Sequence, residues 1–190
     1  MKTSNHIAFK EWAVVCQALR AGAQTLFIRK GGISEGRDGF RINHDEFWLY
    51  PTQFHQGDEA IVPSAKPYWE ATRDNAPPAN QVPISLYCTV SDVHELADLD
   101  CLHRLAGLHI LSEKTVEQRF HYRQPGVFVI VARVYRLAEP FDVTETATMA
   151  GCKSWVELPD AFSTAGLIPV LSDEDFAELR DAVRRILFET

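Results

Sequence analysis

Apolar residues occur along this chain in short runs, separated by segments rich in polar residues, glycine or proline. Most runs contain β-branched and aromatic residues, and such runs between turn signals are typical of β-strands. The first half of the run at 126–137 is apolar at both alternating positions, which predicts a central strand covered on both faces. The predicted strands are residues 11–19, 24–30, 47–50, 82–90, 126–137 and 152–158.

Helical spacing of apolar residues is found in fewer places. Four leucines within 96–105 are spaced for one face of a helix, which Ser91 or Asp92 would cap. A second helix is predicted over 112–120. A third is predicted over 172–188, where a serine and three acidic residues form an N-terminal cap.

The order of these elements lacks the strict β-α-β alternation of a doubly wound sheet. It predicts an α+β fold with a mostly antiparallel sheet, open or barrel-like, and a few packed helices. The length of 190 residues predicts a single domain over 1–190. Within it, the proline-rich segment 57–81 predicts a long irregular loop with one short helix, and 172–188 is the C-terminal helix.

Composition narrows the classes of function. The net charge of −7 argues against a protein that coats DNA, although it allows a small basic pocket. The N-terminal residues lack an apolar signal core, and no apolar run is long enough to span a bilayer. The four cysteines show no C-x-x-C pair and are expected to be buried free thiols. We therefore expect a cytoplasmic protein without membrane contact.

The first candidate site follows the strand predicted at 24–30. Arg29 and Lys30 are followed there by Gly31 and Gly32. Two cations beside glycine backbone N–H groups can bind an anion such as a phosphate or a carboxylate. The spacing differs from that of a Walker loop, and a turn with a solvated basic pair is an equal alternative.

The second candidate site is the segment 50–56, where Pro51 ends an apolar run. His55 could act as a general acid or base near neutral pH. Tyr50 offers an aromatic ring, while Thr52 and Gln56 could form hydrogen bonds with a base, an amide or a phosphate. The alternative is a structural turn in which His55 and Gln56 satisfy backbone groups.

The third candidate site is the segment 151–157. On a strand, Lys153, Trp155 and Glu157 share one face because side chains alternate. They could form a polar pocket, or equally a surface ion pair beside a packing tryptophan. The charged residues of 114–119 are interpreted as a solvated helix face.

No local motif for a metal or a cofactor is present, and the histidines show no H-E-x-x-H spacing. No metal ligand and no cofactor is therefore assigned. A metal site built from residues far apart in the sequence remains open, and the residues considered for it are Glu11, His44, Glu46 and His55.

Several of these segments occur together in a fixed order that resembles the bacterial domain-of-unknown-function family 1802. The segments that carry the resemblance are 10–12, 27–33, 47–52, 55–56, 133–137 and 151–158. The resemblance implies little about activity, because that family is uncharacterised. Some of its members are associated with an Mrr-type restriction endonuclease domain, which implies a role in restriction or defence.

Residues 112–119 are also similar to the G-x-K-x-x-E-x-R motif of ASCH domains, with Ser112 in place of the glycine. Those domains are small barrels related to PUA modules and are linked to RNA or modified nucleosides. This resemblance implies a nucleic-acid or nucleotide ligand.

The resulting hypothesis is a protein that binds a nucleic acid element or nucleotide in a restriction or defence setting. The cations at 29–30 would bind phosphate, Tyr50 or Trp155 would stack on a base, and His55 with Gln56 would form hydrogen bonds with it. A protein of a restriction system is the partner that the resemblance implies.

Two alternatives stay open, so the sequence leaves catalysis undecided. In a hydrolase acting on nucleic acid or nucleotide, His55 would be the general base. Lys30 or Lys153 would stabilise negative charge, and Glu11 or Glu157 would orient the base or hold a metal. In the other alternative, the chain is a non-catalytic interaction subunit.

Overall fold

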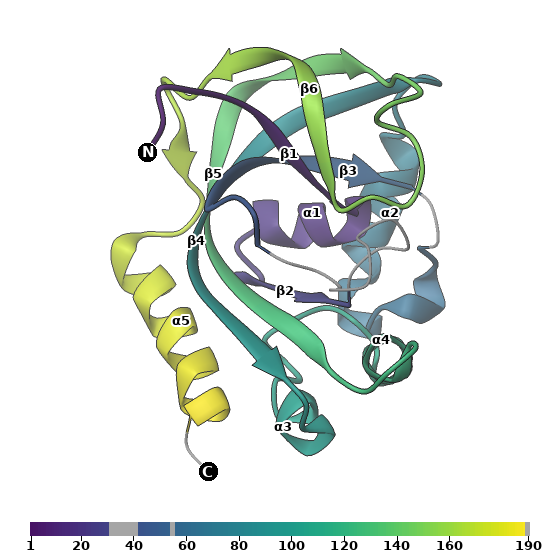
Figure 1. Cartoon of the computed structure of the whole chain (residues 1–190), viewed down its shortest axis with the longest axis vertical. Coiled ribbons are helices and arrows are strands. Elements are labelled where there is room, and N and C mark those ends of the chain that lie inside the picture. The colour runs from purple at the N-terminus through teal and green to yellow at the C-terminus, as the bar shows by residue number, and fades with distance from the viewer. Residues whose placement is uncertain (31–41, 54–55, 189–190) are drawn as a thin grey trace.

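The computed structural model describes residues 1–30, 42–53 and 56–188, and their strands form one curved sheet with helices packed on it (Figure 1). The strands are β1 (Ser4–Trp12), β2 (Leu26–Arg29), β3 (Glu46–Thr52), β4 (Gln81–Leu96), β5 (Val127–Thr144), β6 (Trp155–Ser163) and β7 (Ile168–Pro169). The helices are α1 (Ala13–Arg20), α2 (Lys66–Asp74), α3 (Leu99–His103), α4 (Glu113–His121) and α5 (Asp173–Phe188).

The strand order is β2-β5-β4-β3-β1-β6, and β7 pairs with β5. All described pairs are antiparallel except β1 with β3, so the carboxyl ends of these two strands lie side by side at Trp12 and Thr52. The end strands β2 and β6 do not pair with each other within the described residues. The predicted α+β class and mostly antiparallel sheet are confirmed, and the sheet is curved but not closed.

Alternating side chains of the central strands build two hydrophobic clusters on opposite faces of the sheet. On β3, Phe47 and Leu49 join the larger cluster, whereas Trp48 and Tyr50 join the smaller one. These four side chains are nearly inaccessible to solvent, so the centre of the sheet is covered on both faces. This double burial explains the continuous apolar runs in the sequence.

The two longest strands, β4 and β5, bend as they cross the molecule (Figure 1). Their pairing shifts register between Ile84 and Leu86 and again between Val90 and Asp92. Each shift places an unequal number of residues on the two strands, which increases local bending and twist. The bends let the same pair of strands line both hydrophobic clusters.

The prediction of a strand over 11–19 is wrong, because β1 ends at Trp12 and α1 begins at Ala13. Six of the eight residues of α1 are buried, and the two polar ones, Gln17 and Arg20, are only partly buried. A short, continuous apolar run has no periodicity that separates a buried helix from a buried strand. Figure 1 shows α1 within the curve of the sheet.

Caps fix where the helices begin. The helix cap predicted at Ser91 or Asp92 is wrong, since β4 continues to Leu96 and the Asp98 carboxylate caps α3. The predicted start of α4 is confirmed, with the Ser112 hydroxyl accepting a hydrogen bond from a first-turn N–H. The segment 57–81 contains two 3-10 turns and the helix α2.

Two further predictions concern the burial of the cysteines and the presence of membrane-spanning segments. Cys16, Cys88 and Cys101 are buried free thiols as predicted, whereas Cys152 is exposed. Among the described helices, none is long and apolar enough to cross a membrane.

Candidate functional site

The end of β2 contacts the end of β1 through a buried ion pair. The Glu11 side chain is 1% exposed, and its Oε2 lies 3.4 Å from Nη1 of Arg29. Nη2 of Arg29 donates a 2.9 Å hydrogen bond to the hydroxyl of Ser154, directly before β6. One guanidinium therefore joins the two ends of the open sheet.

A second guanidinium reaches the same corner from α4. Nη1 of Arg119 donates to the backbone carbonyl of Ile28 at 2.6 Å, and its guanidinium lies 4.4 Å from the ring centre of Trp12. Burial lowers the pKa of Arg119 to about 10; the charge of Glu11 opposes this shift, and that of Arg29 adds to it. We name Glu11, Trp12, Arg29 and Arg119 the arginine cluster.

Lys30 lies next to this cluster but faces backbone oxygens. Its ammonium donates to the carbonyls of Phe120, Gln124 and Gly126, the first at 3.1 Å. The carbonyl of Phe120 belongs to the last turn of α4 and the other two follow the helix end, where a cation is favourable. Burial lowers the pKa of Lys30. The three carbonyls carry no formal charge, so Lys30 adds positive charge to this corner.

The charges of the arginine cluster do not balance. Within the described part of the chain, Glu11 is the one carboxylate in ion-pair contact with Arg29. Nε of Arg29 is shielded from solvent and has no hydrogen-bond partner there. A buried donor without an acceptor is costly, and two close cations repel each other. An anion beside both guanidiniums would relieve both problems.

His109 lies close enough to Arg119 to be affected by its charge. The imidazole is buried, and its Nδ1 accepts a 3.2 Å hydrogen bond from the backbone N–H of Leu111. Burial, and then the charge of Arg119, lower the pKa of His109 to about 4. His109 is therefore neutral near pH 7.

Two candidates from the segment 50–56 lie at the ends of the parallel strands, with polar atoms bonded to backbone. The Thr52 hydroxyl donates to the carbonyl of Glu11 at 3.2 Å. Oε1 of Gln56 accepts a 3.1 Å hydrogen bond from the N–H of Val14, in the first turn of α1. Both side chains thus fix the junction between β1 and α1.

Tyr50 belongs to the opposite face of the sheet. Its ring is 1% exposed, and its hydroxyl donates to Oε1 of Glu145 at 2.8 Å. Burial and this hydrogen bond raise the pKa of Tyr50. The ammonium of Lys10 lies 5.1 Å from the ring centre and 3.9 Å from Oε1 of Glu145. The structure does not bring Tyr50 together with the arginine cluster.

The segment 151–157 contacts the arginine cluster through the hydroxyl of Ser154, and its three predicted site residues occupy different positions. Lys153 is exposed, precedes β6 and donates to the carbonyl of Thr148 at 3.1 Å. Glu157 is exposed on β6. The half-buried ring of Trp155 packs on Phe9, with the ring centres 4.8 Å apart.

Three predicted site residues, Gly31, Gly32 and His55, lie outside the described residues. The hydrolase alternative assigns the role of general base to His55. Because His55 lies outside the described residues, this alternative stays a prediction. Its two charge-stabilising candidates, Lys30 and Lys153, are bonded to carbonyls in different parts of the chain.

Sequence reasoning missed three residues at this corner. The sequence predicts a solvated helix face around Arg119, and the one signal for its role is its place as the final residue of the ASCH-like motif. Ser154 and His109 gave no local signal, because their partners are far away in the sequence or depend on burial.

The described residues include one group that could hold a metal ion, formed by His103, Glu113 and Glu117. The last two belong to α4, the helix that also carries Arg119. Because Glu117 and Arg119 are two positions apart, their side chains leave the helix on different sides.

Comparison with known proteins gives one family match. The family model described as a domain of unknown function, DUF1802, matches residues 8–182. No curated protein matches the chain.

Similar solved structures include ASCH proteins from Zymomonas mobilis. One is 13% identical with a TM-score of 0.45, over 92% of this chain and 93% of that chain. A serine-to-alanine mutant is 13% identical with a TM-score of 0.48, over 95% of this chain and 98% of that chain.

Proposed function

The chain belongs to the DUF1802 family, and we propose that it binds a nucleotide or nucleic acid element through one or two phosphate groups at the arginine cluster. The observation that carries this proposal is the charge of the cluster. Two guanidiniums share one buried carboxylate, and Nε of Arg29 lacks an acceptor among the described residues. Guanidinium groups match the geometry of phosphate oxygens and bind them through paired hydrogen bonds.

Each member of the cluster has a role in this proposal. Arg29 and Arg119 bind phosphate oxygens, and Glu11 keeps Arg29 oriented. Trp12, half-buried beside Arg119, offers an aromatic surface on which a base can stack. Trp155 remains the second stacking candidate.

Lys30 is best explained as a positioning residue. Its ammonium holds three carbonyls at and beyond the end of α4, and the first of them follows Arg119 directly. Lys30 thereby fixes the helix end from which Arg119 reaches β2. This supports an indirect contribution to phosphate binding, in place of the direct contact expected from the sequence.

A binding experiment tests the proposal. Short fluorescein-labelled RNA and DNA strands, and unlabelled nucleoside triphosphates as competitors, are titrated with the wild type, Arg29→Gln and Arg119→Gln. Loss of one charged hydrogen bond to phosphate should weaken binding by about tenfold or more. The matched control is Arg73→Gln, an exposed arginine on α2, which should bind like the wild type.

The double variant Glu11→Gln/Arg29→Gln guards against a purely structural effect. It removes the carboxylate and its guanidinium partner together, so no unpaired charge of this pair stays buried. If the double variant is folded, it should bind the labelled strands more weakly than the wild type does. Wild-type protein that binds none of these ligands, or arginine variants that bind them equally well, would contradict the proposal.

The setting in restriction or defence is a further part of the proposal and rests on the family resemblance alone. We expect cells that express the chain to resist infection by some bacteriophages better than cells that express Arg119→Gln. Equal plating efficiencies of a broad panel of phages on the two kinds of cells would contradict a role in restriction or defence. The proposal of phosphate binding would be unaffected.

A further inference from the structure

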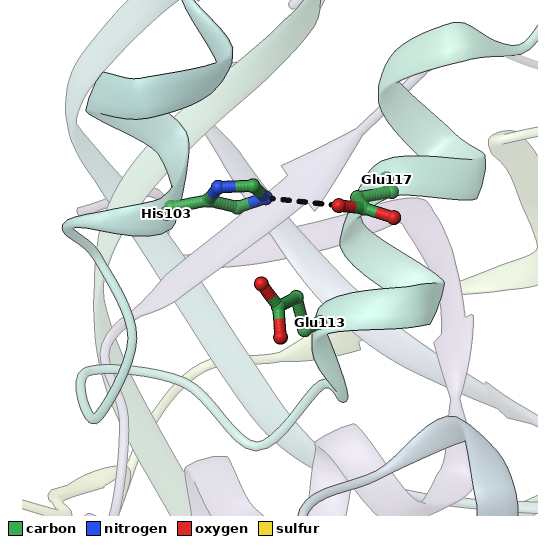
Figure 2. A group of neighbouring side chains, drawn as sticks. All are labelled: His103, Glu113 and Glu117. Carbon is green, nitrogen blue, oxygen red and sulfur yellow. Dashed lines mark ion pairs between the residues drawn. The ribbon is translucent and has the colours of Figure 1, made fainter.

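We propose that His103, Glu113 and Glu117 bind one divalent transition-metal ion at the junction of α3 and α4. Each of the three side chains offers one donor atom, and these atoms lie within 4.8 Å of one another. Figure 2 shows the imidazole of His103 and both carboxylates directed into the same space between the two helices. This site is separate from the proposed phosphate site and needs no nucleotide.

The local structure explains why these residues meet. Ser112 caps α4, which places Glu113 in its first turn and Glu117 one turn later on the same face. His103 is the last residue of α3, and the connecting segment 104–112 brings α4 back beside it. Neither helix alone contains the complete ligand set.

The environment of His103 points to a missing partner. Its Nε2 is shielded from solvent and has no hydrogen-bond partner among the described residues. The atom lies 3.6 Å from Oε1 of Glu117, beyond the usual range of a hydrogen bond. A metal ion would use the lone pair of this nitrogen, which otherwise stays unsatisfied.

A simple ion pair between protonated His103 and Glu117 explains less of the geometry. It gives no role to Glu113, and it leaves two carboxylates one helical turn apart, an arrangement that destabilises a helix. A divalent cation neutralises both carboxylates and joins α3 to α4.

The donor set indicates the class of metal. One imidazole and two carboxylates suit Zn²⁺, Mn²⁺ or Fe²⁺, whereas Ca²⁺ and Mg²⁺ prefer oxygen ligands alone. Bonds of about 2.0–2.2 Å from these donors would bring the donor atoms closer together than the present limit of 4.8 Å. Glu113 is exposed and the other two residues are half-buried, so water can complete the coordination.

Calorimetry tests the site directly. The full chain is stripped with a chelator, dialysed, and titrated with zinc chloride and with manganese chloride. We expect one ion per chain for at least one of the two metals, and a higher midpoint of thermal unfolding with that metal. His103→Ala and Glu117→Gln should weaken binding by about tenfold or more, because loss of even an outer partner has an effect of this size.

Matched controls separate this site from adventitious binding. His121→Ala removes an exposed histidine from the same helix, and Glu178→Gln removes an exposed carboxylate from α5; both should bind metal like the wild type. Circular dichroism in chelator should show that all four variants are folded. Absence of binding, wild-type affinity in His103→Ala and Glu117→Gln, or tighter binding of magnesium than of zinc and manganese would overturn the proposal.

Discussion

The Glu11 carboxylate shows how a single buried acid can stabilise the whole corner. Replacement by glutamine keeps the size but leaves Arg29 and Arg119 without their counter-charge. Breaking a largely buried ion pair is strongly destabilising, so we expect Glu11→Gln to lower the free energy of unfolding by roughly 2–3 kcal/mol. Urea unfolding measures this loss. Glu95→Gln, at an exposed position, should change little, and equal stabilities of the two variants would contradict this account.

His109 makes stability depend on pH. Its pKa is about 4 in the folded chain and near 6.5 when the chain is unfolded, so only the unfolded state takes up this proton in between. The free energy of unfolding should therefore fall by roughly 3 kcal/mol as the pH drops from about 6.5 to about 4. Urea unfolding at a series of pH values measures this slope.

The variant His109→Asn isolates that contribution. Asparagine retains an acceptor for the N–H of Leu111 but does not titrate, so its stability should fall less steeply over the same pH range. The control variant His121→Asn replaces an exposed histidine and should leave the pH dependence of stability unchanged. A wild-type slope in His109→Asn would show that other groups cause the pH dependence.

At the residue scale, the sequence predicts chemical types but not partners. The sequence predicts Arg29 and Lys30 at the end of a strand, and β2 ends at Arg29. The partner of Lys30 at Phe120 is 90 positions away, and that of Arg29 at Ser154 is 125 positions away. A local sequence pattern carries no information on partners so far apart in the sequence. The carbonyl contacts of Lys30 could therefore not be predicted.

At the element scale, α5 is held on the sheet by charged as well as apolar contacts. Nε and Nη2 of Arg184 donate to Oδ1 of Asp92 on β4 at 2.9 and 2.6 Å, while Phe176 and Val183 are buried. Burial alone would raise the pKa of Asp92, but hydrogen bonds from Ser91 and Arg184 outweigh it and lower the pKa. This pair therefore stabilises α5 at neutral pH and is lost on acidification below about pH 4.

Loss of this pair should loosen α5 selectively. The pair is partly exposed, so we expect Arg184→Gln to cost about 1 kcal/mol of local stability, or roughly fivefold faster amide hydrogen exchange in α5. Exchange in the central strands should be unchanged. Arg185→Gln, at the exposed neighbouring position, is the matched control. Equal exchange in the two variants would show that the pair between Arg184 and Asp92 contributes little to the attachment of α5.

The ends of helices and strands could be predicted where a local sequence pattern marks them. The prediction failed where tertiary contacts determine where an element ends. Ser112 marks the start of α4 in both sequence and structure. In contrast, β4 extends past Ser91 to Leu96 because residues such as Val93 pair with Ile130 on β5. The sequence predicts a strand in place of α1 because the apolar run 13–16 contains two adjacent valines and is too short to show a helical period.

At the scale of the whole molecule, a net charge of −7 coexists with a local excess of positive charge. The open sheet makes this possible, since its two ends meet through Arg29 and α4 delivers Arg119 from outside the sheet. The acidic remainder of the surface repels an extended polyanion. A ligand that contacts the chain at one or two phosphates fits this charge distribution better than a long nucleic acid bound along its surface.

The salt dependence of binding distinguishes these two modes. Two phosphate contacts on a single strand predict a slope of about −1.4 for log affinity against log salt concentration, or roughly sevenfold weaker binding between about 50 and 200 mM salt. Arg119→Gln should reduce the size of this slope by about 0.7, whereas Arg73→Gln should leave it unchanged. Fluorescence anisotropy with a short labelled strand measures all three slopes. A wild-type slope steeper than about −4 would indicate six or more phosphate contacts, and the ligand would then lie along an extended surface beyond the arginine cluster.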